Sequence, residues 1–389
     1  MNQLDGPPTP IRAIDEPGIK ISYEVVRSLR QEVADLLHRS TPAFPGAQPV
    51  SFTRKHLDEL LREDYYVCEK SDGIRYLLYL TEDESGKESH YLIDRKNDYW
   101  YINTGSLHFP TPHNQQDFHK GTVLDGELVM DTLTDGRQEP RYLVFDCLAM
   151  DGQSLIKRDL NKRLGYFQEQ VLKPYKKLLD EYPSERQFQP FFICLKSMQM
   201  SYGIHVVFDD IKNLKHENDG LIFTCLWSEY KPGTDPHILK WKEAEENTVD
   251  FIWKLRFPKV EPDEYDRAEG VTAPFVDYEA KPMVDLLANH GGGFPHGYQY
   301  FAELHLEDNE WEILKGLGDP LDDRVVEVYM DAQKRWRFYR FRDDKSDGNH
   351  ISVVNSVIES IQDAVTKEDL LNHMKAVRDN WKARGKVRK

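Results

Sequence analysis

Apolar residues recur at helical spacing in two places near the start of the chain. The first stripe runs from Tyr23 to Leu37, where Ser22 can cap a helix, and the second predicts a helix over 54–63. From residue 65 to about residue 242, short apolar or alternating runs predict strands, with helical spacing at 160–177 and 206–215. Because the strands follow one another without regular helical crossovers, the pattern is typical of an α+β fold with mainly antiparallel sheets.

The pattern changes after a polar segment at 243–250, which we interpret as a hinge. Five short runs beyond it predict strands, and five strands in a small unit are typical of an OB-type barrel. These runs are 251–257, 298–306, 310–315, 325–330 and 335–342. We expect an N-terminal lead and helix over 1–40, a larger domain over 41–242, and an OB-fold domain with C-terminal helices and a basic tail over 251–389.

Composition narrows the possible functions. A chain of 389 residues, 39% of them hydrophobic, can bury the cores of two domains, and no apolar run approaches the roughly 18 residues of a membrane span. The polar, proline-rich start lacks the pattern of a secretory signal. The four cysteines lie far apart among apolar neighbours, so we interpret them as reduced core residues. A net charge of −16 means that any phosphate chemistry must come from local clusters of lysine and arginine.

The first candidate for chemistry is Lys70, which ends an apolar run and precedes a Ser-Asp-Gly turn that leads to Arg75. A period of two places Lys70 on one strand face with Tyr66 and Cys68, at the rim of a pocket with apolar walls. A lysine attacks an electrophile only when it is deprotonated, which burial and a neighbouring cation such as Arg75 favour. The alternative is a hairpin turn with a solvated lysine, and this motif alone does not decide between them.

Two further motifs place carboxylates at the start of apolar strands. Asp125 and Glu127 are two residues apart, so both can face one side, and Mg²⁺ bound to phosphates takes one or two carboxylates. Asp219 precedes a glycine and another apolar run in the same way. Taken singly, each motif also fits a surface turn.

Two motifs place basic side chains in pairs. Lys240 and Lys242 would share one face of a strand with Trp241 on the other, and such a pair is costly to bury unless an anion lies between the two charges. An exposed edge strand is the alternative. Arg340 and Arg342 also alternate along a strand, which suits phosphate recognition or, alternatively, a charged strand end with local ion pairs.

Together, these motifs resemble those of the covalent nucleotidyltransferase superfamily, which contains DNA ligases, RNA ligases and the guanylyltransferases of mRNA capping. The motifs occur in the family's order: K-x-D-G-x-R, D-G-E, a strand with Phe145, D-G-x-I-F, L-K-W-K and R-x-R-x-D-K. Within this superfamily the chain is similar to the fungal type of capping guanylyltransferase, over roughly residues 40–350. The resemblance is specific because six motifs occur in order across two predicted domains.

The resemblance implies a reaction in two steps. Lys70 would attack the α-phosphate of GTP, expel pyrophosphate and form a lysyl-N–GMP intermediate. The 5′-diphosphate end of an RNA would then take the GMP and become a GpppN cap. An alternative within the superfamily is an ATP-dependent RNA or DNA ligase, and an alternative of another class is an inactive scaffold that binds RNA or the tail of RNA polymerase II.

The resemblance also assigns contacts to residues at matching positions. Glu127 and Asp219 would organise Mg²⁺ or Mn²⁺. The other assigned residues would contact the nucleotide: Arg75 and Arg95 the ribose or phosphates, Phe145 and Ile222 the purine faces, Lys196 the guanine O6, Lys240 and Lys242 the α-phosphate, and Arg340, Arg342, Asp344 and Lys345 the β- and γ-phosphates when the cleft closes.

Partners follow from the same resemblance. The sequence contains no His-Cys-x5-Arg phosphatase loop, so a separate RNA 5′-triphosphatase subunit is implied. The implied partners are therefore 5′-diphosphate RNA, that subunit and the phosphorylated C-terminal tail of RNA polymerase II, with no membrane. The implied location is the nucleus.

Overall fold

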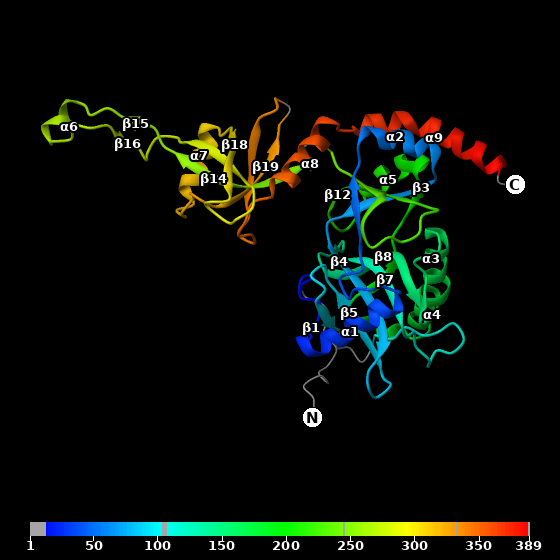
Figure 1. Ribbon diagram of the computed structural model, residues 1–389. Coiled ribbons are helices and arrows are strands. Elements are labelled where there is room, and N and C mark those ends of the chain that lie inside the picture. Colours follow the sequence, from blue (N-terminus) through cyan, green and yellow to red (C-terminus); the bar gives the residue numbers. More distant parts are fainter. Residues whose placement is uncertain (1–12, 103–106, 244–245, 332, 388–389) are drawn as a thin grey trace. The chain divides into compact units, whose positions relative to one another are not determined.

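The computed structural model describes residues 13–102, 107–243, 246–331 and 333–387 (Figure 1). The chain divides into two compact units, one of residues 1–241 and 368–389 and one of residues 242–367. The predicted hinge at 243–250 therefore falls just inside the second unit, and residues 244–245 of it lie outside the described residues, as do residues 1–12 of the predicted lead. The α+β class with two domains is confirmed.

The first unit contains a large sheet in the order β1-β6-β5-β4-β7-β8-β10, with β9 on β8. Every pairing is antiparallel except that of β8 with β10, which confirms the predicted antiparallel bias. The strands are β1 (Ile19–Lys20), β4 (Ile74–Glu82), β5 (Glu88–Ile93), β6 (Tyr99–Tyr101), β7 (Thr122–Thr132), β8 (Gln138–Met150), β9 (Gln153–Ser154) and β10 (Phe192–Leu195).

A second sheet of the same unit has the order β11-β3-β12-β13-β2. Its strands are β2 (Ala47–Ser51), β3 (Tyr65–Ser71), β11 (Gln199–Met200), β12 (Asn218–Cys225) and β13 (Gly233–Trp241). The turn after Lys70 joins β3 in this sheet to β4 in the large sheet, so the alternative of a hairpin turn is wrong. Gly73 is required in this turn, because a Cβ atom there would lie 2.5 Å from the carbonyl oxygen of Leu128.

Helices cover the sheets of the first unit. They are α1 (Tyr23–Leu36), α2 (Arg54–Arg62), α3 (Leu160–Tyr166), α4 (Lys173–Glu181) and α5 (Ile204–Ile211), with the π-helical turn η1 (Phe167–Leu172) and the 3-10 turns η2 (Pro183–Phe188) and η3 (Ser201–Gly203). Ser22 occupies the N-cap position of α1 but makes no side-chain hydrogen bond there. Phe167, Val171 and Tyr175 of η1 and α4 are buried in the core of the large sheet. All four cysteines are free and three of them are buried, as predicted.

The second unit is a closed barrel in the order β14-β17-β18-β20-β19, which confirms the OB-type prediction. Its strands are β14 (Thr248–Arg256), β17 (Met283–Asn289), β18 (Tyr298–Leu304), β19 (Val325–Met330) and β20 (Trp336–Phe341). The strand predicted at 310–315 is wrong, because this segment belongs to helix α7 (Asp308–Gly316). Trp311 and Leu314, three residues apart, bury one face of that helix, and Glu307 and Glu310 form a capping box.

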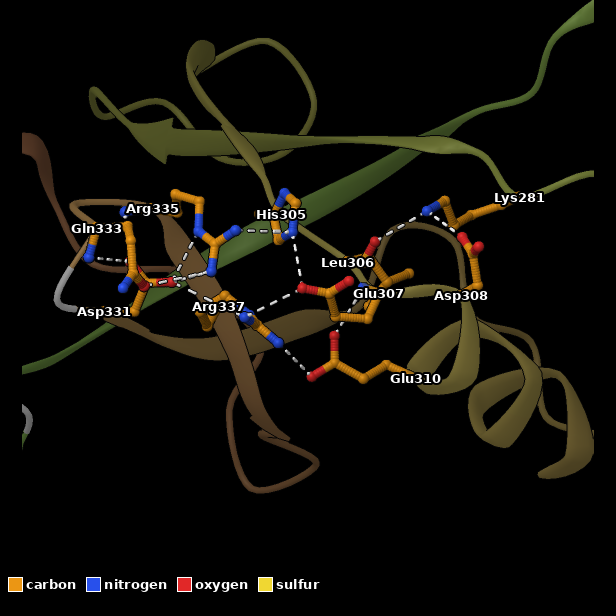
Figure 2. A network of polar contacts seen from close by, with 10 residues as sticks. All are labelled: Lys281, His305, Leu306, Glu307, Asp308, Glu310, Asp331, Gln333, Arg335 and Arg337. Carbon is orange, nitrogen blue, oxygen red and sulfur yellow. Dashed lines mark hydrogen bonds and ion pairs between the residues drawn. The ribbon is translucent and has the colours of Figure 1, made fainter.

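A polar network fastens α7 to the barrel (Figure 2). Nη2 of Arg337 on β20 donates to Glu310 over 2.8 Å, while Nη1 lies 3.6 Å from Glu307 and 3.8 Å from Asp331. The remaining elements of this unit are α8 (Ile351–Gln362) and an arm of β15 (Lys259–Val260), α6 (Glu264–Ala268) and β16 (Phe275–Val276), which extends from the barrel (Figure 1).

Helix α9 (Lys367–Val387) belongs almost wholly to the first unit, so its assignment to the C-terminal domain is corrected. Leu370 and Val377 are buried on one face of α9, and Trp381 packs against Tyr202. Arg384 binds Asp64 and the carbonyl oxygen of Leu61, at the end of α2. Of the basic tail, residues 388–389 lie outside the described residues. Within the described chain, no helix has the length and apolar character that a bilayer crossing requires.

Candidate nucleotide pocket

A cavity of about 120 Å³ lies in the first unit and is lined by residues of both sheets. Among the residues predicted for the site, it brings together Lys70, Arg75, Arg95, Glu127, Phe145, Lys196 and Ile222. Other lining residues, which the sequence analysis did not assign to the nucleotide, include Ala47, Pro49, Cys68, Glu69, Asp125, Asp146, Met198, Thr224, Tyr230 and Ile238. Burial raises the pKa of the Cys68 thiol to about 12, so this side chain stays uncharged at neutral pH.

Lys70 lies near the end of β3, and a quarter of its side chain is exposed. Its Nζ donates a hydrogen bond to Oδ1 of Asp219. Asp219 lies where the pairing of β12 with β3 shifts register, between Asn218 and Leu221. Asp219 therefore contacts the predicted nucleophile directly, while its predicted role toward a metal stays a prediction.

Arg75 is held by a buried network. Its guanidinium donates to both carboxylate oxygens of Asp125, over 2.9 and 2.6 Å, and the hydroxyl of Tyr230 donates to the same carboxylate over 2.6 Å. Burial alone would lower the pKa of Arg75, but the charge of Asp125 outweighs burial and raises it. Asp125 thus neutralises the cation that we expected to act on Lys70.

Glu127 and Asp125 both line the pocket, which confirms that the spacing of two residues places them on one side of β7. Glu127 accepts a hydrogen bond from Ser71 over 2.6 Å. Between them, Gly126 is required because a Cβ atom would lie 2.6 Å from the ring of Tyr142. The pairing of β7 with β8 shifts register beside Gly126, which leaves Phe145 as an extra residue at the pocket.

Three cations of the pocket lining, Arg75, Arg95 and Lys196, differ in their surroundings. The guanidinium of Arg75 lies 5.5 Å from the centre of the Phe145 ring. The pKa of Arg95 is lowered, first by burial and then by the positive charge of Arg75. Lys196 follows β10, and its side chain is 3% exposed. Lys196 Nζ lies 2.9 Å from Oε1 of Glu69 and donates to Ser71.

Contrary to the expectation, Lys240 and Lys242 do not lie together on one strand. Lys240 lies on β13, paired with Ile222, and Trp241 is buried, but β13 ends at Trp241, so Lys242 lies beyond the strand and in the second unit. Within the described chain, neither lysine is part of the pocket lining. Their predicted contact with the α-phosphate stays a prediction.

The basic residues at the end of β20 form ion pairs within the second unit. Arg340 and Arg342 both approach Glu327, at 2.6 and 3.6 Å, so the two arginines share a face as predicted. Arg342 also binds Asp250 and Asp344, and Lys345 binds Asp250. Three basic side chains are thus matched by three carboxylates, those of Glu327, Asp250 and Asp344.

Two features of the pocket were not predicted from the sequence: Tyr230 and the pairing of Asp125 with Arg75. Tyr230 holds Ala47 as well as Asp125, since the backbone nitrogen of Ala47 donates to its hydroxyl over 2.8 Å. Tyr230 belongs to none of the recognised motifs and lies more than 100 residues from Asp125. A local pattern therefore carried no signal for this contact.

The sequence matches two families over nearly its whole length. Residues 12–244 match the family described as "mRNA capping enzyme, catalytic domain", and residues 246–371 match "mRNA capping enzyme, C-terminal domain". An "mRNA-capping enzyme subunit alpha" of Neurospora crassa is 54% identical over 98% of this chain and 97% of its own length. The protein of that name in Schizosaccharomyces pombe is 43% identical over 97% of this chain and 91% of its own.

Among solved structures, the similarity is more distant. A mycobacterial DNA ligase D in complex with ATP and MES covers 77% of this chain and 95% of its own chain, with a TM-score of 0.36 and 16% identity. A similarity this distant does not bear on function.

Proposed function

Because this chain belongs to the mRNA capping enzyme family and is an mRNA guanylyltransferase that uses GTP, we propose that its reaction proceeds through a covalent bond between Lys70 and GMP. The observation that carries the proposal is the place of Lys70, whose side chain lies at the wall of a pocket lined by both sheets. Asp219 holds its Nζ there. Phe145 and Ile222 offer apolar faces to a purine, and Lys196 offers a donor to the guanine O6.

In the first step, the deprotonated Nζ of Lys70 attacks the α-phosphorus of GTP. A phosphorus–nitrogen bond forms, the bond from the α-phosphorus to the bridging oxygen breaks, and pyrophosphate leaves. In the second step, an oxygen of the terminal phosphate of 5′-diphosphate RNA attacks the same phosphorus and frees Lys70. Both steps bring anions together, so positioning and charge neutralisation dominate catalysis. Arg95, Lys240 and Lys242 are the cations that we assign to the phosphates and ribose.

A divalent cation suits two carboxylates, that of Glu127 in the pocket lining and that of Asp219 beside Lys70. The carboxylates of Glu127 and Asp219 are hard oxygen ligands, which fit Mg²⁺ or Mn²⁺ that arrives with the phosphates. Within the described residues, no group of three His, Cys, Asp or Glu side chains forms a metal site by itself. Two carboxylates with substrate phosphates are sufficient for Mg²⁺. Such an ion would neutralise charge on the phosphates when bound.

The family also supports a proposal for the assembly and the location of the protein. Relatives named "subunit alpha" support a second subunit, which we assign to the RNA 5′-triphosphatase step because that step must supply the 5′-diphosphate end. We further propose that the enzyme binds the phosphorylated tail of RNA polymerase II and acts in the nucleus, where capped transcripts are made.

Incubation with α-labelled GTP or ATP tests the proposal. We expect a stable protein–GMP adduct with GTP and no adduct with ATP. Formation of the adduct should require Mg²⁺ or Mn²⁺, and added pyrophosphate should reverse it. An adduct formed with ATP and not with GTP would favour a ligase. Full labelling with GTP in excess EDTA would contradict the role of the metal.

A further inference from the structure

A row of alternating charges extends from the nucleotide pocket toward the large sheet. Lys196 Nζ lies 2.9 Å from Oε1 of Glu69, and the same oxygen lies 3.8 Å from Nε2 of His216. His216 Nδ1 lies 2.7 Å from Oδ1 of Asp131, whose other oxygen lies 2.8 Å from Nε of Arg141. Only Lys196 of these five residues has a role in the function proposed above.

The row joins the two sheets. Glu69 belongs to β3 of the smaller sheet, and Asp131 and Arg141 belong to β7 and β8 of the large one. His216 lies between them, in the segment that leads from α5 to β12. The side chains of His216 and Glu69 are 10% and 9% exposed, so each depends on its partners for compensation of its charge.

The same oxygen of Glu69, Oε1, lies near two cations, Lys196 and His216. A positive charge on His216 partly compensates the negative charge of Glu69. If His216 carried no charge, Glu69 would attract Lys196 alone and hold its ammonium group more tightly against β3. Because electrostatic attraction is strong where water is excluded, this change would withdraw Lys196 from a ligand in the pocket.

We propose that His216 is a positioning residue for guanine recognition, which shares the charge of Glu69 and so leaves the ammonium group of Lys196 available to the O6 atom of the base. The inference rests on the proposed contact of Lys196 with guanine.

The ionisation of His216 agrees with this role. Burial alone would lower the pKa of His216, but its hydrogen bond to Asp131 and the attraction of Glu69 outweigh burial and raise the pKa to about 9. His216 therefore carries its charge at neutral pH. Burial would also raise the pKa of Glu69, but His216 and Lys196 outweigh burial and lower it.

The test compares His216→Gln with the unaltered enzyme in single-turnover formation of the covalent lysyl–nucleotide adduct. The two nucleotides are GTP and 2-aminopurine riboside triphosphate, which lacks O6 and keeps the 2-amino group. We expect the apparent Kd for GTP to rise about tenfold, the size of one weakened charged hydrogen bond, with the rate at saturation and the Kd of the analogue unchanged.

His90→Gln is the matched control, because His90 is also a buried histidine, 3.0 Å from Glu88 on β5. It should lower stability without changing either Kd. If His216→Gln does not fold, Asp131→Asn replaces it. Removing the negative charge beside Nδ1 disfavours the protonated form of His216 and should shift the GTP Kd in the same direction.

Three results for His216→Gln would overturn the inference. They are an equal rise in Kd for both nucleotides, a lower saturating rate with an unchanged GTP Kd, and no change in either quantity. Lys196→Met separates this failure from that of the proposed function. If Lys196→Met preserves the preference for GTP over the analogue, the contact of Lys196 with guanine is wrong. If Lys196→Met loses the preference and His216→Gln keeps it, only the role of His216 is wrong.

Discussion

At the scale of single residues, the pocket depends on a buried ion pair. Arg75 and Asp125 bind each other through two hydrogen bonds, with side chains 8% and 0% exposed. Asp125→Asn should lower the free energy of unfolding by about 3–5 kcal/mol, because it leaves a buried guanidinium without its counter-charge. Chemical denaturation measures this loss. Asp135→Asn, in the exposed pair with Arg137, should leave the free energy of unfolding almost unchanged, and similar losses in both variants would contradict the importance of burial for the Arg75–Asp125 pair.

His216 also makes stability depend on pH. It faces Asp131 from β7 and Glu69 from β3, with Lys196 beyond. Its pKa is about 9 in the folded chain against 6.5 ordinarily, so its contribution is complete below pH 6.5 and is lost as the pH rises through 9. Between pH 6.5 and 9.5 the free energy of unfolding should fall by up to about 3 kcal/mol from this residue. Denaturation of His216→Gln should show a flatter pH profile, and an unchanged slope would refute the raised pKa.

At the scale of elements, polar contacts of Arg384 add to the apolar packing that holds helix α9 in the first unit. Arg384 donates to Asp64 over 2.7 Å, to the carbonyl oxygen of Leu61 in α2 and to that of Glu63 just after the helix. Arg384→Ala should lower the free energy of unfolding by about 1–3 kcal/mol and speed proteolytic removal of α9, because charged hydrogen bonds are lost. Arg378→Ala, exposed on the same helix, is the control. Equal effects of both substitutions would mean that Arg384 does not hold α9.

A helix or strand can be predicted well when the residues that determine it lie close together in the sequence. The apolar run that ends at Lys70 and the apolar stripe from Tyr23 to Leu37 are local patterns, and β3 and α1 form there as expected. In α7, the spacing of Trp311 and Leu314 fits a helix, yet the apolar run was interpreted as a strand. The missing barrel strand, β17, alternates at Val284, Leu286 and Ala288, a pattern that the sequence analysis overlooked.

Site residues, too, were predicted where a local motif contains them. Motifs identified Lys70, Glu127 and Phe145, and the fold brings these residues to one pocket. Contacts between distant segments were not accessible, because Tyr230 and His216 meet their partners only after the two sheets pack.

At the scale of the whole molecule, the two units should contribute unequally to the two chemical steps. We expect Arg342 of the barrel to act on the β- and γ-phosphates, which are present only in the step with GTP. Arg342→Ala should slow lysyl–GMP formation by roughly 100-fold or more, and transfer from preformed lysyl–GMP to RNA much less. Single-turnover kinetics of each step measures this. Arg256→Ala, an exposed arginine of the same barrel, is the control, and equal slowing of both steps by Arg342→Ala would contradict this division of labour.

The central claim is that Lys70 carries GMP, and the adduct itself tests it most directly. The unaltered enzyme, Lys70→Arg and the control Lys120→Arg, an exposed lysine paired with Glu82, are incubated with α-labelled GTP and a divalent metal. Arginine keeps the charge but is not deprotonated in proteins, so it cannot serve as the nucleophile. The account predicts a GMP adduct of equal intensity in the unaltered enzyme and Lys120→Arg, located on Lys70 by peptide mass spectrometry, and none in a folded Lys70→Arg. An undiminished adduct in Lys70→Arg, or a label on another residue of the unaltered enzyme, would contradict it.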